Sequence, residues 1–393
     1  MEWKEVLLSE FLEFNPKRTI KKNEVARKIT MDLLIPHSKQ IYSFKYEPYT
    51  GGAKFSNGDT IMARITPCLE NGKHAYVSCL NEGEIAYGST EYIVLCGKNG
   101  VSDNEFVYYL SHTPQFVNTA IKSMVGSSGR QRAQVPVLEN LIMPVPVNLS
   151  DQRKIAGILS ALDSKIENNN KINANLEAQA EALFKSWFVD FTPFKDQPFV
   201  DSELGPIPQG WKVGKINEFV DVIYGAPYKS KLFNTQKEGL PLIRIRDLKT
   251  CSPQFYTKEL LPNTELVNYG DVVAGMDAEF TPHIWLGETG LLNQRVCKFK
   301  PHTGISPLYS MLMIKPKLEF AQNYKVGTTV SHLGKSDIDK FIVIVPPLDI
   351  VKEVSSIFDA VLNEQIYLAK ENQRLAALRD TLLPKLMSGE IKL

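Results

Sequence analysis

Two glycine-containing loops carry the side chains best suited to binding a polyanion. The first loop is GSSGRQR, which begins at Gly126. Serine hydroxyls and arginine guanidinium groups beside glycine can reach phosphate oxygens and base edges with little steric hindrance. The second loop is GTTVSHLGK, which begins at Gly327. The candidate DNA-binding residues of the two loops are Ser127, Ser128, Arg130 and Arg132 in the first, and Thr328, Thr329, Ser331, His332 and Lys335 in the second.

Three further arginines are weaker candidates for DNA contact. Arg64 follows GDTIMA, and Arg244 and Arg246 belong to LIRIRDL. The alternative for each, a surface ion pair, is favoured over DNA contact. The net charge of +1 gives no global argument for nucleic acid, so any DNA affinity must come from local basic patches or be shared with partner subunits.

Motifs for catalysis and for metal or nucleotide binding are not found in this sequence. The run GTTVSHLGKSD resembles a phosphate-binding loop, but six residues separate its glycines where that loop needs four. The chain has no HExxH, no GxSxG and no cluster of cysteine with histidine. Its five cysteines form no CxxC pair, and no segment has the roughly 18 apolar residues of a membrane span, so we expect a cytoplasmic protein without metal.

The chain repeats itself, and this duplication organises the elements that must position the loops. Four landmarks recur in the same order, at offsets of about 200 residues. The offsets differ slightly from one landmark to the next, as insertions and deletions in surface loops would cause. The pairs are Trp3-Lys4 with Trp211-Lys212, Gly58-Asp59 with Gly270-Asp271, Val125-Gly126 with Val326-Gly327, and Pro146 with Pro346.

A long helical segment follows each copy, and the two segments align without gaps at an offset of 199. Apolar residues in both recur at alternating steps of four and three, which predicts a coiled-coil seam. Ser150 and Asp349 are candidate N-caps. The first seam is Ile155, Leu159, Leu162, Ile166, Asn169, Asn173, Leu176, Ala180 and Leu183, and the second is Val354, Phe358, Val361, Gln365, Leu368, Asn372, Leu375, Arg379 and Leu382.

These patterns predict an α+β fold with two pseudo-two-fold-related domains of mixed α and β structure, separated by two long antiparallel helices. Short β-rich runs between glycine, proline and asparagine clusters support the mixed class. The expected order is a first domain over 1–147, a helix over 148–195, a second domain over 196–346 and a helix over 347–393. Residues 196–211, rich in proline, glycine and acids, form the linker of the second domain.

Asn173 and Asn372 occupy the same seam position of the two helices. In an antiparallel pair they could meet near the crossing point and fix the register; alternatively, both face solvent where the helices diverge. Trp187 and Phe188 belong to FKSWFVDF, which holds more aromatic surface than a solvated helix end should expose. These aromatic residues either pack as core or dock a partner subunit.

The helices and their flanking stretches resemble the conserved regions of type I restriction-modification specificity subunits. The resemblance covers essentially the whole chain. It is carried by SDQRKIAGILSALDSKIENNNKINANLEAQAEALFKSWFVDFTPF, by LGPIPQGW, and by a closing stretch that ends in LLPKLMSGEI.

The resemblance implies a DNA-binding subunit with two target-recognition domains, which directs two methyltransferase subunits and the restriction-translocase subunits to a bipartite, asymmetric DNA target. It implies no catalysis by this chain: S-adenosylmethionine, ATP and Mg would be held by the partner subunits. Gln152 matches the glutamine usual near the helix start, but the second copy has Val351 there, so a partner contact of Gln152 would be asymmetric.

Two other functions remain open from the sequence. An enzyme that fuses restriction and modification would share such domains, but it needs catalytic motifs that are not found here. A coiled-coil adaptor without a DNA role fits the neutral charge, but it does not explain two divergent β-rich domains beside matched helices.

Overall fold

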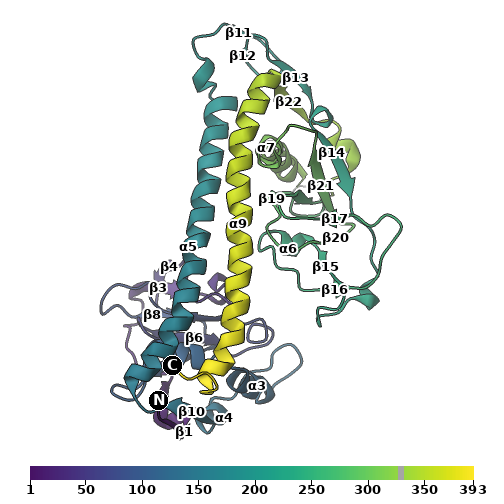
Figure 1. Ribbon diagram of the computed structural model, residues 1–393. Helices are drawn as coiled ribbons and strands as arrows, with labels where there is room; N and C mark the ends of the chain where they lie inside the picture. Colours follow the sequence, from purple (N-terminus) through teal and green to yellow (C-terminus); the bar gives the residue numbers. More distant parts are fainter. Residues whose placement is uncertain (326–331) are drawn as a thin grey trace. The chain divides into compact units, whose positions relative to one another are not determined.

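The computed structural model describes residues 1–325 and 332–393 and divides them between two compact units. Unit 1 consists of Met1–Asn168 together with Gln373–Leu393, and unit 2 consists of Asn169–Asn372. Unit 1 therefore contains both chain ends, while unit 2 is one continuous segment (Figure 1).

Unit 1 contains two four-stranded sheets and a two-stranded ribbon. The first sheet has the antiparallel order β2-β9-β6-β7, and the second has the order β4-β3-β8-β5, in which β3 and β8 are parallel. Apolar runs such as YIVLCG in β9 bury both faces, because helices and the second sheet cover them. The strands are β1 (Trp3–Leu7), β2 (Leu12–Phe14), β3 (Val25–Ile29), β4 (Lys45–Pro48), β5 (Lys54–Phe55), β6 (Thr60–Ala63), β7 (His74–Tyr76), β8 (Ala86–Gly88), β9 (Tyr92–Gly97) and β10 (Ile142–Pro146).

Unit 2 repeats this strand topology. Its sheets have the orders β14-β21-β18-β19 and β16-β15-β20-β17, and β15 and β20 form the parallel pair. In each unit an early strand pairs with the strand before a long helix, β1 with β10 and β13 with β22. The strands are β11 (Phe199–Val200), β12 (Ile207–Pro208), β13 (Lys212–Lys215), β14 (Val220–Tyr224), β15 (Leu240–Ile243), β16 (Tyr256–Thr257), β17 (Leu266–Val267), β18 (Val272–Gly275), β19 (Pro282–Ile284), β20 (Gly290–Leu292), β21 (Val296–Pro301) and β22 (Ile342–Val345).

The shorter helices flank these sheets. Unit 1 has α1 (Leu8–Phe11), η1 (Met31–Leu33), α2 (Asn104–Leu110), α3 (Pro114–Lys122) and α4 (Val135–Glu139). Unit 2 has η2 (Thr192–Phe194), η3 (Ile216–Glu218), η4 (Ser230–Leu232), α6 (Ile245–Leu248), α7 (Pro307–Lys325) and α8 (Lys335–Ile338).

Two helices of 40 residues each, α5 (Leu149–Phe188) and α9 (Leu348–Met387), contribute to both units. In unit 1, Ile155 and Leu159 of α5 share a core with Leu383 and Leu386 of α9. In unit 2, Ala180 of α5 shares a core with residues from the first turns of α9. Because early residues of one helix meet late residues of the other, the helices are antiparallel within each unit.

The sequence pattern identified the helix faces correctly. Every one of the 18 seam residues named above is buried or half-buried. The fold prediction of two similar α and β domains with two long antiparallel helices is confirmed by the repeated strand order and the helix bounds.

Candidate nucleic-acid interface

The first glycine loop of unit 1 is a tight hairpin closed by two backbone hydrogen bonds. Val125 N–H donates to the Arg132 carbonyl at 3.1 Å, and Arg132 N–H donates to the Val125 carbonyl at 3.0 Å. Gly126 and Gly129 have φ values of 136° and 76°, a region that side chains with a Cβ rarely adopt. The loop therefore exposes Ser127, Ser128 and Arg130 at its tip.

The base of this loop is attached to the ends of two central strands. Ala133 N–H donates to the carbonyl of Arg64, the residue after β6, at 2.8 Å. Arg64 N–H in turn donates to the carbonyl of Glu91, the residue before β9, at 2.9 Å. The structure thus brings Arg64, Arg130 and Arg132 to one edge of the sheet.

The three arginines at this edge have different surroundings. Arg132 binds both carboxylate oxygens of Glu91, at 2.7 to 3.0 Å, and this hydrogen bonding holds the pKa of Glu91 below its usual value. Arg64 donates to the Ala133 carbonyl at 3.2 Å. Within residues 1–325 and 332–393, Arg130 has no ion-pair partner. Arg130 is therefore the cation of this loop that is available to a phosphate or a guanine edge.

Unit 2 builds the corresponding edge with other residues. Leu333 N–H donates to the Met276 carbonyl at 2.7 Å, which is the counterpart of the bond between Ala133 and Arg64. Asp277 accepts from His332 Nδ1 at 2.6 Å and lies 3.2 Å from Arg295. Lys335 is exposed at the start of α8. Thr328, Thr329 and Ser331 lie outside the described residues.

Arg295 was not among the residues singled out from the sequence. It directly precedes β21, as Glu91 directly precedes β9, and its side chain is 55% exposed. A strand-by-strand alignment of the two copies would have found it, because both residues stand at the entrance to the equivalent strand. No glycine stands beside Arg295 in the sequence, unlike Arg130 of the first glycine loop.

Arg244 and Arg246 have opposite roles in the structure. Arg244 binds the Asp247 carboxylate at 3.0 and 3.2 Å, and its guanidinium lies 4.4 Å from the centre of the Phe255 ring. The contacts of Arg244 therefore support the ion pair that the sequence analysis gave as the alternative to DNA contact. Arg246 is exposed on α6, which packs against β18 near Asp277, and it makes no ion pair within the described part of the chain.

Gln152, a candidate for an asymmetric partner contact, is fully buried in this structure and makes its hydrogen bonds within unit 1. Its amide accepts from Asp103 N–H at 2.8 Å and donates to the carbonyls of Val101 at 3.0 Å and Pro146 at 3.1 Å. Gln152 therefore ties the start of α5 to two neighbouring segments. In the second copy Val351, also buried, packs there against an apolar core.

Asn173 and Asn372 were predicted either to pair or to face solvent, and in unit 2 Asn372 instead pairs with other asparagines. Asn169 donates to the side-chain oxygen of Asn372 at 2.9 Å, and Asn372 donates to Asn170 at 2.8 Å. Asn173 uses its backbone carbonyl to accept from Gln365 at 3.5 Å. In an antiparallel helix pair, the register decides which residue of one helix lies opposite a given residue of the other. The sequence does not determine this register.

Trp187 and Phe188 pack as core of unit 2. Phe188 is 7% exposed, and its ring centre lies 5.1 Å from that of Tyr309 and 5.9 Å from that of Trp211. Trp187 packs edge-on against Phe194 at 6.0 Å. Their contacts thus support the core alternative.

Two other kinds of feature, a metal centre and a membrane span, find no support in the residues that the structure describes. No group of three histidine, cysteine or acidic side chains could hold a metal ion within 1–325 and 332–393. No helix of the described chain is long and apolar enough to cross a bilayer. The arrangement found is a pair of polar loop edges that could bind phosphates and bases.

The chain matches the family model of the type I restriction modification DNA specificity domain over residues 1–178 and 208–378. It is 31% identical to the type I restriction enzyme MjaIX specificity subunit of Methanocaldococcus jannaschii, over 75% of this chain and 70% of that protein. It is 24% identical to the HindI specificity subunit of Haemophilus influenzae, over 90% of both chains.

Solved structures with a similar chain were also found. An HsdS subunit from Thermoanaerobacter tengcongensis has 17% sequence identity and a TM-score of 0.40, over 99% of this chain and 97% of that chain. An S subunit from M. genitalium has 14% identity and a TM-score of 0.49, over 98% and 96%. On the strength of the family match to both halves and of the relative that is 31% identical, the chain belongs to the type I restriction-modification DNA specificity family.

Proposed function

We propose that this chain is the DNA-sequence-recognition subunit of a type I restriction-modification complex and that units 1 and 2 each bind one part of a bipartite, asymmetric target. One observation carries the proposal: the same edge of the same fold bears different polar groups in the two units. Arg130 and the Arg132–Glu91 pair stand at this edge in unit 1, and Asp277 with His332 and Arg295 stands there in unit 2.

Side chains of different hydrogen-bonding types select different bases. Arginine donates in pairs to guanine, while a carboxylate accepts from the cytosine amino group. Two edges that differ in this way would bind unlike half-sites, and the complete target would then be asymmetric. The curated relatives of this chain are named as specificity subunits, which agrees with this role.

In this proposal the chain is not catalytic. Two methyltransferase subunits would hold S-adenosylmethionine and transfer the methyl group, and restriction-translocase subunits would hold ATP and Mg. The chain would act in the cytoplasm, where the chromosome lies. Its own contribution would be to select the position on DNA at which those partners act.

The proposal is tested by mapping methylated adenines in cells that express the modification subunits with or without this chain. We expect one bipartite motif with an unread centre to be methylated only when the chain is present. A methylation pattern that does not change when the chain is removed would contradict the proposal. It would favour an adaptor without a DNA role.

A further inference from the structure

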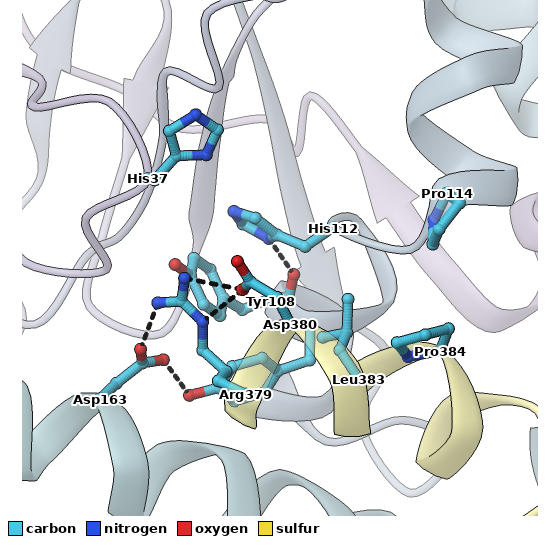
Figure 2. Close-up of a pocket in the computed structure, with 10 residues that line it drawn as sticks. His37, Tyr108, His112, Pro114, Asp163, Arg379, Asp380, Leu383 and Pro384 are labelled. Atoms are coloured by element: carbon cyan, nitrogen blue, oxygen red, sulfur yellow. Dashed lines mark hydrogen bonds and ion pairs between the residues drawn. The ribbon is translucent and has the colours of Figure 1, made fainter. Parts of the chain in front are cut away.

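Unit 1 contains a cavity of about 270 Å³ that is lined by none of the candidate DNA-binding residues (Figure 2). It lies where α2 and the residues after it meet parts of α5 and α9. Its walls include the rings of Tyr108, Tyr109 and His112, the apolar side chain of Leu383, and the carboxylate of Asp380. The cavity therefore combines aromatic, apolar and charged surface.

The charged groups of the cavity have a net charge of −1. The Arg379 guanidinium lies between two carboxylates, 2.7 Å from Asp163 and 2.8 Å from Asp380, as Figure 2 shows. The Asp163 side chain is 8% exposed, whereas the Asp380 side chain is 68% exposed. One cation cannot neutralise two carboxylates, so the accessible one, Asp380, carries the excess negative charge.

His112 presents a free acceptor in the same cavity. Its Nδ1 lies 2.8 Å from the carbonyl oxygen of Tyr108, so this nitrogen carries the proton and donates. Burial lowers the pKa of His112 to about 4, which keeps the ring neutral. Nε2 is then a lone-pair acceptor, and it is buried without a hydrogen-bond partner in the described structure. A buried acceptor of this kind is stabilised by a donor that enters the cavity.

The duplication shows which donor fits at this position. His112 lies nine residues after Asp103, the N-cap of α2, and Lys315 lies nine residues after Ser306, which precedes α7. Asp380 corresponds to Glu181 at the helix offset of 199. In unit 2 the Lys315 ammonium lies 2.5 Å from the Glu181 carboxylate. Unit 2 therefore has its own ammonium where unit 1 has a neutral imidazole.

We propose that the cavity of unit 1 binds a primary alkylammonium group from outside the chain, in the place that the Lys315 ammonium takes in unit 2. The ammonium would donate to His112 Nε2 and to the Asp380 carboxylate. The alkyl chain would lie against Leu383, and the Tyr108 ring would attract the cation through its face. Such a group is supplied by a lysine of a partner protein or by a free polyamine, and neither depends on DNA recognition.

Thermal unfolding of the full chain with n-butylammonium chloride tests the proposal. The control salt is tetramethylammonium chloride at equal concentration, since its cation has no N–H donor. We expect a saturable rise of Tm with n-butylammonium alone, because a ligand that binds only the folded state stabilises it. In Asp380→Asn the affinity should fall at least tenfold. An equal response to both salts, or an Asp380→Asn response like that of the unchanged chain, would overturn the proposal.

Two exchange variants sharpen the test. His112→Lys should place an ammonium in the cavity, raise Tm without ligand and abolish the n-butylammonium response. Lys315→His should open the equivalent place in unit 2 and lower Tm without ligand. A full n-butylammonium response in a folded His112→Lys variant would contradict the proposal. If His112→Lys does not fold, the Tm measurements on Asp380→Asn and Lys315→His still test the proposal.

The source of the ammonium group is distinguished by comparing spermidine with n-butylammonium. Affinity for spermidine at least tenfold higher would identify a free polyamine as the ligand. Equal affinities would identify a lysine side chain of a partner. These measurements contain no DNA, so a negative result would leave the proposed function untouched.

Discussion

At the scale of single residues, exposure and pairing separate the groups that bind a ligand from those that hold the fold. Arg132 and Arg130 are two positions apart on one loop, but Arg132 is engaged by Glu91 and Arg130 is not. The sequence could nominate both, because it shows the residue types and the glycines. It could not show which arginine finds an acid, because Glu91 is 41 residues away and approaches only through the sheet.

Arg130→Ala should weaken DNA binding by the assembled complex without changing the stability of the chain. Loss of one phosphate contact lowers the slope of log affinity against log salt by about 1, and loss of a guanine contact costs about 1–3 kcal/mol. Arg374→Ala, which removes an exposed arginine of α9, is the matched control and should bind normally. Filter binding at several salt concentrations measures the affinity and the salt slope of both variants. Equal affinity of the two variants would contradict this role.

Two buried histidines of unit 1 should make its stability depend on pH. Burial lowers the pKa of His74 well below 6.5 and that of His112 to about 4, and their ring centres lie 4.7 Å apart. Below about pH 6.5 the unfolded chain binds protons that the folded chain does not, so stability is full above that pH and falls as the pH drops toward 4.

His74→Leu removes one of these groups and should flatten the fall of Tm between pH 7 and pH 5. Its ring is 1% exposed and neither nitrogen has a partner in the described structure, so leucine loses no hydrogen bond there. Calorimetry at several pH values measures the slope for the variant and for the unchanged chain. Identical slopes would show that His74 does not contribute.

At the scale of elements, the start of each long helix is fixed differently in the two copies. Gln152 satisfies three backbone groups in unit 1, whereas Val351 relies on apolar packing in unit 2. The sequence showed this difference, and the family resemblance made Gln152 a candidate for a partner contact. The burial of Gln152 is explained by Val101 and Asp103, whose backbone groups lie close enough to hydrogen-bond to its amide.

Gln152→Ala should destabilise the chain by about 2–4 kcal/mol, because it leaves buried donors and acceptors unpaired. Val351→Ala, at the equivalent position, removes two methyl groups and should cost roughly 1–2 kcal/mol. Urea denaturation of both variants gives the free energies. A cost below about 1 kcal/mol for Gln152→Ala would mean that water replaces its hydrogen bonds.

At the scale of the whole chain, the sequence revealed the duplication but not the compact units. The predicted boundaries at 148 and 347 fall at the starts of α5 and α9, whereas α5 ends at Phe188, before the predicted boundary at 196. The compact units instead divide both helices, because the end of α9 packs with the N-terminal domain and its beginning with the second domain. Such contacts follow from antiparallel pairing between segments about 200 residues apart, which no local pattern encodes.

The two long helices, α5 and α9, have 40 residues each, and we predict that their length sets the spacing of the two half-sites. Seven residues inserted into both helices, after Asn168 and after Asn372, add about 10 Å and keep the same faces inward. At about 3.4 Å per base pair, the unread centre of the methylated motif should lengthen by about three base pairs with unchanged half-sites. The same insertion in α5 alone mismatches the helix pair and should abolish methylation. An unchanged spacer in the double insertion would exclude the helices as the element that sets the distance.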